Sequence, residues 1–141
     1  MILIDSNVVI DMLSESGEWK KWSTDAVADA GADSPLAVTP VVVAEVAPRA
    51  GTLEKFLDGI GRFGVSVVEL DSEAAFAAGT AFNIYRNRKR EGSESTGSII
   101  ADFLIGGQAL ALQAAIVTRD PRFYRTYFPS VPLITPDKAT P

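Results

Sequence analysis

The chain has 141 residues, 47% of them hydrophobic, which suits one globular domain that buries roughly 70% of the surface its unfolded form exposes. It contains no cysteine and no histidine. This excludes disulfides, thiolate catalysis and imidazole ligands, and leaves oxygen ligands with Mg²⁺ or Mn²⁺ as the favoured metal chemistry. The net charge of −5 argues against a nucleic-acid partner unless the basic residues are gathered, because affinity for phosphate backbones comes from Lys and Arg.

Apolar runs alternate with helical patterns through the first half of the chain. Short apolar runs are typical of buried parallel strands, and apolar residues spaced three and four apart are typical of helices. In chain order, the patterns predict a strand at 2–4, helices at 7–13 and 18–30, a strand at 36–38, helices at 40–47 and 52–63, and a strand at 65–70. Thr39 is the predicted N-cap of the helix that starts at Pro40, and Pro48 is predicted to end that helix.

The second half continues the alternation. It predicts a helix from 71 or 72 to about 90, a polar loop at 91–97, a helix from 98 to about 114, a strand at 116–118, a short helix from 121 and a strand at 132–134. Strands that alternate with helices predict a right-handed α/β fold with a mostly parallel sheet. We expect one domain, residues 1–135, followed by a polar C-terminal tail, residues 136–141.

One stretch is apolar enough to be compared with a membrane span. Residues 99–117 are almost entirely apolar but contain Asp102 and the pair Gly106-Gly107, and a charge inside a span costs on the order of 2.5–3.5 kcal/mol. The stretch therefore predicts a buried helix followed by a buried strand. The N-terminal apolar run lacks a basic flank and is broken at Asp5, so no signal peptide is apparent. We expect a cytoplasmic protein with no membrane association.

Four acidic residues stand next to the predicted strand ends. Asp5 and Asp120 come directly after predicted strands, whereas Glu45 and Asp102 lie in the early turns of predicted helices that begin near the same edge. The carboxyl ends of parallel strands are where α/β sheets form their binding crevices, so the four side chains can converge. Carboxylates gathered at low dielectric repel one another unless a cation lies between them. Convergence would therefore imply metal binding.

Each acid also has a structural interpretation. Asp5 and Asp120, which precedes Pro121, are good N-cap candidates, a role that does not exclude metal binding. Glu45 and Asp102 are harder to explain in this way. Each lies among apolar residues in a helix that should be buried, and a buried carboxylate is rare unless it is paired.

Four motifs in a fixed order carry a family resemblance. They are Ile-Asp-Ser-Asn-Val-Val-Ile-Asp at residues 4–11, Thr-Pro-Val-Val-Val-Ala-Glu-Val at 39–46, Ile-Ile-Ala-Asp-Phe-Leu-Ile-Gly at 99–106, and Ile-Val-Thr-Arg-Asp-Pro-Arg-Phe at 116–123. In this order and spacing they resemble the PIN-domain ribonucleases. Within that family they most resemble the VapC-type toxins of bacterial toxin–antitoxin pairs. The resemblance spans residues 2 to about 132.

The resemblance implies a PIN-like three-layer α/β/α fold with a mostly parallel sheet of about five strands, and a metal-dependent endoribonuclease. The family's catalytic acidic quartet, which binds one or two Mg²⁺ or Mn²⁺ ions, is carried onto Asp5, Glu45, Asp102 and Asp120. The family often places polar side chains against the acids, here at Ser6 or Asn7 and at Thr118. The implied partners are an RNA substrate, a small antitoxin protein and a second copy of the chain in a homodimer.

One departure from the family lies in the predicted helix after residue 98. Gly106-Gly107 stands where such helices usually have Ala-Ala, and a Gly pair costs roughly 2 kcal/mol of helix propensity relative to Ala. We expect close packing or a local bend at this point.

An acidic pocket repels the RNA backbone, so cations must flank it. The candidate RNA-binding residues are Arg86, Arg88, Lys89, Arg90, Arg119, Arg122 and Arg125. The first four have an almost equally good structural explanation, because cations at a helix C-terminus complement its dipole. Tyr124 or Tyr127 is a candidate for stacking on an unpaired base. Phe123 and Tyr127, however, are expected to pack within the fold.

Two functions from different classes stay open. The first is a metal-dependent endoribonuclease that hydrolyses RNA phosphodiester bonds as the toxin of a toxin–antitoxin pair. The second is a non-catalytic PIN-like module that docks a protein or RNA partner. The full set of four acids favours the enzyme, because a pure scaffold has no need of buried charge.

Overall fold

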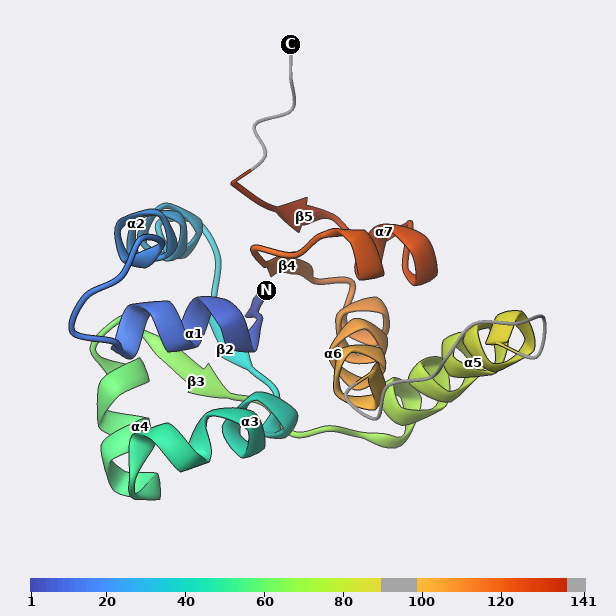
Figure 1. The fold of residues 1–141 in the computed structure, drawn as a ribbon, viewed down its shortest axis with the longest axis horizontal. Coiled ribbons are helices and arrows are strands. Elements are labelled where there is room, and N and C mark those ends of the chain that lie inside the picture. Colours follow the sequence, from blue (N-terminus) through green and yellow to red (C-terminus); the bar gives the residue numbers. More distant parts are fainter. Residues whose placement is uncertain (90–98, 137–141) are drawn as a thin grey trace, which may run out of the picture.

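The computed structural model describes residues 1–89 and 99–136 of the chain. In this part, five short strands form one sheet in the order β3-β2-β1-β4-β5, and every pairing is parallel (Figure 1). The strands are β1 (Ile2–Ile4), β2 (Leu36–Val38), β3 (Val65–Val67), β4 (Ala115–Val117) and β5 (Leu133–Ile134). The predicted α/β fold is confirmed, and the sheet is parallel throughout rather than mostly parallel.

Helices connect the strands in the predicted order. They are α1 (Ser6–Leu13), α2 (Lys20–Gly31), α3 (Pro40–Ala50), α4 (Leu53–Gly61), α5 (Ser72–Lys89), α6 (Ile99–Leu112) and α7 (Arg122–Tyr127). Hydroxyl and carboxylate caps begin several of them: Thr39 accepts a hydrogen bond from Val41 N at 3.1 Å, and Asp71 from Ala74 N at 2.9 Å. The predicted loop at 91–97, the predicted helix start at 98 and residues 137–141 of the predicted tail lie outside the described residues.

The predicted end of α3 at Pro48 is wrong. The helix continues through Pro48 to Ala50 and ends at Gly51, which has a positive φ of 83°. Proline removes one helical hydrogen bond, to the carbonyl of Ala44. Both Pro48 and Ala44 are exposed, so water can satisfy that carbonyl and the helix tolerates the loss near its end.

The central strand β1 sets the position of the site. It pairs with β2 on one side and with β4 on the other, so the order of the strands reverses at β1, which is where open α/β sheets place their ligands. Its side chains Leu3 and Ile4 are fully buried. The residues that leave the carboxyl ends of these three neighbouring strands are Thr39, Asp5 and Thr118, and all three are buried polar groups.

Helix α6 continues through the Gly106-Gly107 pair. Of the two alternatives expected there, close packing is confirmed rather than a bend. A Cβ added to Gly107 would lie 2.6 Å from the backbone of Ala74 and of Ala78 on α5, and one added to Gly106 would lie 2.3 Å from the Phe128 ring. Glycine therefore lets α5 and α6 approach closely, which offsets its poor helix propensity.

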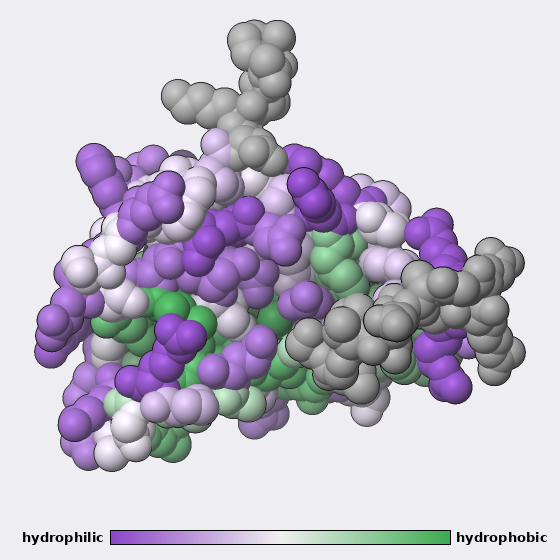
Figure 2. Space-filling model, viewed as in Figure 1, coloured by the Kyte–Doolittle hydropathy of each residue, from purple (hydrophilic) through white to green (hydrophobic). Residues whose placement is uncertain are grey.

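An apolar cleft opens at the surface where α1, α3 and α4 meet. Figure 2 shows an apolar patch over this region. A cavity of about 260 Å³ there is lined by the apolar Ile10, Leu13, Val46 and Ala50 together with Ser14 and Arg49. Next to it, a smaller cavity of about 190 Å³ lies beside Leu53, which is 61% exposed. Leu53, at the start of α4, thus lies outside the core.

Residues 99–117 do not form a single apolar helix, because α6 ends at Leu112 and β4 follows it. Within the described residues, no helix combines the length and apolar character needed to cross a bilayer.

Candidate active site

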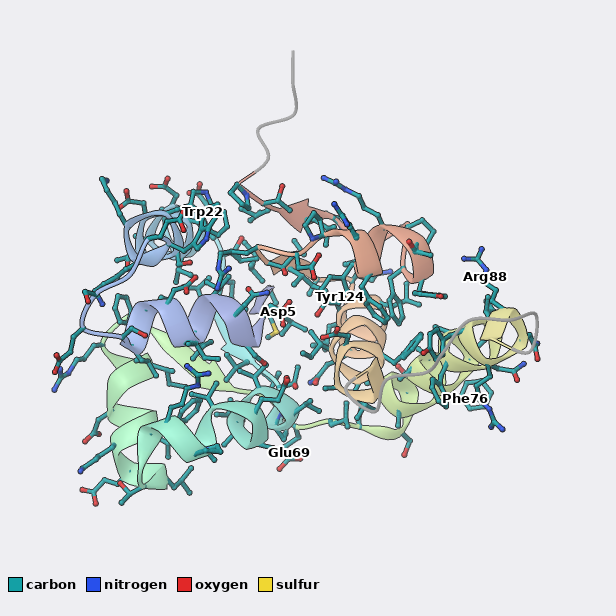
Figure 3. The ribbon with its side chains drawn as sticks, viewed as in Figure 1. Asp5, Trp22, Glu69, Phe76, Arg88 and Tyr124 are labelled. Carbon is teal, nitrogen blue, oxygen red and sulfur yellow. The ribbon has the colours of Figure 1, made fainter. Side chains whose placement is uncertain are left out.

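Asp5 lies at the centre of the site, directly after β1 and at the start of α1. Its side chain accepts a hydrogen bond from Ser6 N, which confirms the predicted N-cap role. The residue is only 5% exposed, and in Figure 3 it lies close to Tyr124 of α7. Burial raises the pKa of Asp5, although the hydrogen bonds to its carboxylate act in the opposite direction.

Three donors hold the Asp5 carboxylate. Oδ1 accepts from Ser6 N at 2.8 Å, whereas Oδ2 accepts from the Thr118 hydroxyl at 2.7 Å and from the Tyr124 hydroxyl at 3.2 Å. Asn7 Nδ2 in turn donates to Thr118 Oγ1 at 3.4 Å. Burial raises the pKa of Tyr124 well above its usual value, so its hydroxyl stays a donor.

Glu45 joins the site through Ser6. The Ser6 hydroxyl donates to Glu45 Oε1 at 2.6 Å, which links α3 to the start of α1. The expectation that Glu45 is buried is wrong, because the residue is exposed. Helix α3 buries only one side, through Val42 and Val46; its other valines do not enclose Glu45, and its carboxylate therefore faces the site from the surface.

Asp102 shows that the four acids share one electrostatic environment. Its pKa is raised from 3.8 to about 7, first by burial and then by the charges of Asp5, Glu45 and Asp120. The residue is half-buried on the first turn of α6. A carboxylate is disfavoured there because partial desolvation and three like charges act together. The structure thus brings the four predicted acids into mutual range.

The four carboxylates are not already arranged as a set of metal ligands. Among the described residues, no three acidic side chains are close enough together to hold a metal ion as they stand. The two ion pairs of the described part, Lys21 with Asp25 and Arg119 with Asp11, involve none of the four. Their mutual repulsion is therefore not neutralised by an ion pair within the described chain.

Asp120 is exposed beside the end of β4. Its backbone N–H donates to Thr118 Oγ1 at 3.1 Å. The expectation that its side chain caps the following helix is wrong, since α7 begins at Arg122 with Pro121 at its N-cap and no side-chain cap. The Asp120 carboxylate therefore has no capping role in α7.

Arg119, a predicted RNA-binding residue, is engaged within the fold. Its guanidinium donates to both carboxylate oxygens of Asp11, at 2.6 and 3.1 Å, and lies 5.5 Å from the Trp19 ring centre. Ser23 on α2 also donates to Asp11, at 2.6 Å. This bidentate, partly buried ion pair links the end of β4 to α1, and Ser23 links the same carboxylate to α2. Arg119 is therefore placed to stabilise the fold.

Arg119→Ala is expected to lower the free energy of unfolding by about 2 kcal/mol, because it leaves a largely buried Asp11 carboxylate without its charged partner. Lys21→Ala is the control, because its ion pair with Asp25 is exposed and is expected to contribute little to stability. Urea unfolding of both variants measures the difference. Equal losses would contradict this role of Arg119.

Four of the other predicted cations lie on α5 and α7. Arg86, Arg88, Arg122 and Arg125 are exposed. Arg88 lies 5.7 Å from the Tyr127 ring centre, and so reaches from α5 toward α7. The side chain of Lys89, and Arg90 as a whole, lie outside what the structure describes.

The two tyrosines proposed for base stacking have different positions. Tyr124 is 1% exposed, so the expectation that it stacks on a base is wrong. Tyr127 packs against Phe103 and Phe123 with ring centres 5.2 and 5.1 Å apart. This confirms that Phe123 and Tyr127 belong to an aromatic cluster of the fold.

Sequence reasoning missed the contact of Tyr124 with Asp5. The two residues are 119 positions apart. The sequence of the short helix α7 does not indicate which of its aromatic rings faces the site. The family resemblance, in contrast, predicts Thr118 against the acids, and its hydroxyl donates to Asp5.

The fold and these acids define an α/β domain with an acidic centre at the reversal point of a parallel sheet. The family model of the PIN domain matches residues 2–129. The chain therefore belongs to the PIN domain family.

Several solved structures share the fold. VapBC2 from Rickettsia felis bound to a promoter DNA fragment matches with a TM-score of 0.65 and 18% identity, covering 96% of this chain and 98% of that one. VapBC-1 from nontypeable Haemophilus influenzae matches with a TM-score of 0.65 and 16% identity, covering 96% and 98%. VapC20 from Mycobacterium tuberculosis, a sarcin–ricin loop cleaving toxin, matches with a TM-score of 0.60 and 13% identity, covering 94% and 99%. A comparison with curated proteins found no match.

Proposed function

We propose that this chain is a metal-dependent endoribonuclease that acts as the toxin of a toxin–antitoxin pair. The observation that carries the proposal is the electrostatic coupling of Asp102 to Asp5, Glu45 and Asp120 at the end of the central strands. Membership of the PIN family and a fold shared with VapBC complexes and a VapC toxin support it.

The donor set fits Mg²⁺ or Mn²⁺. The chain has no histidine or cysteine, and hard divalent cations prefer carboxylate oxygens. A cluster that holds the pKa of one of its acids near 7 is short of positive charge, which a divalent cation would supply. Asp5, Glu45, Asp102 and Asp120 would hold the ion. When bound, the ion would supply the Lewis acidity that phosphodiester hydrolysis needs.

The remaining side chains of the site have supporting roles in this proposal. Ser6 holds Glu45 and Thr118 holds Asp5, so both acids keep their orientation when an RNA phosphate approaches. In this proposal, exposed arginines on α5 and α7, among them Arg88 and Arg122, would bind the RNA backbone and offset its repulsion by the acids. Arg119 differs from them, because its Nε and Nη2 already donate to Asp11.

The partner in this proposal is a small antitoxin. The solved structures that share the fold include a toxin–antitoxin complex from Klebsiella pneumoniae and VapBC proteins bound to DNA. The apolar cleft lined by Ile10, Leu13 and Val46 offers a surface that an apolar segment of such a partner can cover. A homodimer remains part of the proposal on the basis of family resemblance.

Cleavage of RNA by the purified chain tests the enzymatic proposal. The wild-type protein is expected to cut RNA with Mg²⁺ or Mn²⁺ and to stop when EDTA is added, whereas Asp5→Asn is expected to lower the rate by about 100-fold or more because it removes a ligand charge. Asp58→Asn is the matched control, since Asp58 is exposed on α4. In cells, expression of the wild type is expected to arrest growth and that of Asp5→Asn is not.

The alternative is a non-catalytic PIN-like module that docks a protein or RNA partner. Exposed apolar residues such as Leu53 and Phe76 are compatible with docking. Docking does not, however, require four acids that influence one another's charge. A folded wild-type protein that cuts no RNA with either cation, and that accumulates without harm to the cell, would favour the docking module.

A further inference from the structure

The Asp5 carboxylate has a limited number of acceptor positions. Its two oxygens together offer about four lone pairs. Two hydroxyl groups, those of Thr118 and Tyr124, donate to Oδ2, and one backbone N–H donates to Oδ1. Among the described residues, Oδ2 is therefore fully used, whereas Oδ1 keeps one open position.

We propose that Tyr124 is a positioning residue: with Thr118 it occupies Oδ2 of Asp5 and makes Asp5 a ligand through Oδ1 alone. This inference rests on the proposed function. It assigns Tyr124 a role in selecting the cation, without contact between Tyr124 and substrate.

A single-oxygen ligand matters because Mg²⁺ and Ca²⁺ use carboxylates differently. Mg²⁺ demands near-octahedral geometry at short distances, which favours one oxygen from each carboxylate, whereas the larger Ca²⁺ readily accepts both oxygens of one carboxylate. The two hydrogen bonds to Oδ2 therefore favour the smaller ion, Mg²⁺. Without Tyr124, only one side-chain hydroxyl would hold the carboxylate, which could then turn and offer both oxygens.

The packing of Tyr124 suits this role. The residue is 1% exposed, and its ring contacts Phe123 with centres 5.5 Å apart, so the surrounding fold fixes the position of its hydroxyl. The Tyr124–Asp5 hydrogen bond at 3.2 Å is longer than the 2.7 Å bond from Thr118. Its removal should therefore change the selectivity of the site without dismantling it.

The test measures cation binding by the intact chain, with Mn²⁺ as an electron-spin-resonance probe and Mg²⁺ and Ca²⁺ as competitors. In Tyr124→Phe, the ratio of Ca²⁺ affinity to Mg²⁺ affinity is expected to rise by about 3- to 10-fold. Thr118→Val removes the other donor to Oδ2 and is expected to shift the ratio in the same direction. Tyr127→Phe is the control: it removes a hydroxyl from the same helix, and the ring of Tyr127 packs on Phe103 rather than on Asp5.

If Tyr124 had a purely structural role, its substitution would lower the affinities for Mg²⁺ and Ca²⁺ by the same factor. An unchanged ratio of the two affinities in both Tyr124→Phe and Thr118→Val would therefore overturn the inference. If the wild type binds Mn²⁺ and cuts RNA but the ratio does not move, the assignment of Tyr124 fails and the proposed function stands. A wild type that binds none of the three cations would overturn both.

Discussion

Asp102→Asn is expected to abolish RNA cleavage and, at the same time, to make the metal-free protein more stable at pH 7. The pKa of Asp102 is raised from 3.8 to about 7, mainly by burial and by the neighbouring acids. The folded state therefore binds this proton more tightly than the unfolded state does. The contribution of Asp102 to the free energy of unfolding therefore falls as the pH rises from about 4 to about 7, and it is lost above that window.

Asparagine removes this cost because it carries no charge. The start of α6 favours a negative charge by about 0.5 kcal/mol through the helix dipole, which is smaller than the cost of burial and repulsion. Allowing for the solvent that reaches a half-buried side chain, we expect a gain of about 1–2 kcal/mol at pH 7 and little gain at pH 4. Urea unfolding in EDTA at the two pH values measures it.

Asp58→Asn again serves as the control, because this exposed residue lies away from the site. An Asp102→Asn variant that is less stable than the wild type at pH 7, or equally affected at both pH values, would contradict the account. A stabilised variant that still cuts RNA would remove Asp102 from the catalytic residues while leaving the electrostatic argument in place.

Gly107→Ala is expected to destabilise the protein by about 2 kcal/mol, although alanine is the better helix former by about 1 kcal/mol. The new Cβ would lie 2.6 Å from backbone atoms of Ala74 and Ala78. Backbone cannot move aside as a flexible side chain can, so α5 and α6 would have to separate. Thermal unfolding of the variant measures the loss.

Gly79→Ala is the matched control within α5. Nothing lies within 4 Å of a Cβ added there, so this variant is expected to be more stable than the wild type by about 0.5–1 kcal/mol. Opposite signs for the two substitutions are the expected result. If Gly107→Ala also stabilised the protein, the close approach of α5 and α6 would not be a property of the folded chain.

Most of the fold could be predicted because local signals agree with the tertiary structure. The strand Ile2–Ile4 and the helix start at Thr39-Pro40 have the same bounds in the sequence pattern and in the structure. Pro48 could not be judged correctly, because whether proline ends a helix depends on the exposure of the carbonyl it leaves unpaired, and that exposure is set by tertiary packing.

The site could be predicted only in outline. The position of Asp5 follows from the end of the first strand, whereas the placing of Thr118 against the acids follows from the family resemblance. The exposure of Glu45, the engagement of Arg119 with Asp11 and the contact of Tyr124 with Asp5 depend on which face each helix turns toward its neighbours. A list of acidic and basic residues does not contain that information.

The most direct test of the central claim is a crystal structure of the intact chain soaked in Mn²⁺, with the anomalous signal of the metal recorded. We expect an anomalous peak within about 2.5 Å of carboxylate oxygens of Asp5 and Asp102, with Glu45 and Asp120 turned toward it. A crystal that shows no peak there, or that shows a lysine or arginine side chain neutralising the acids, would contradict the account.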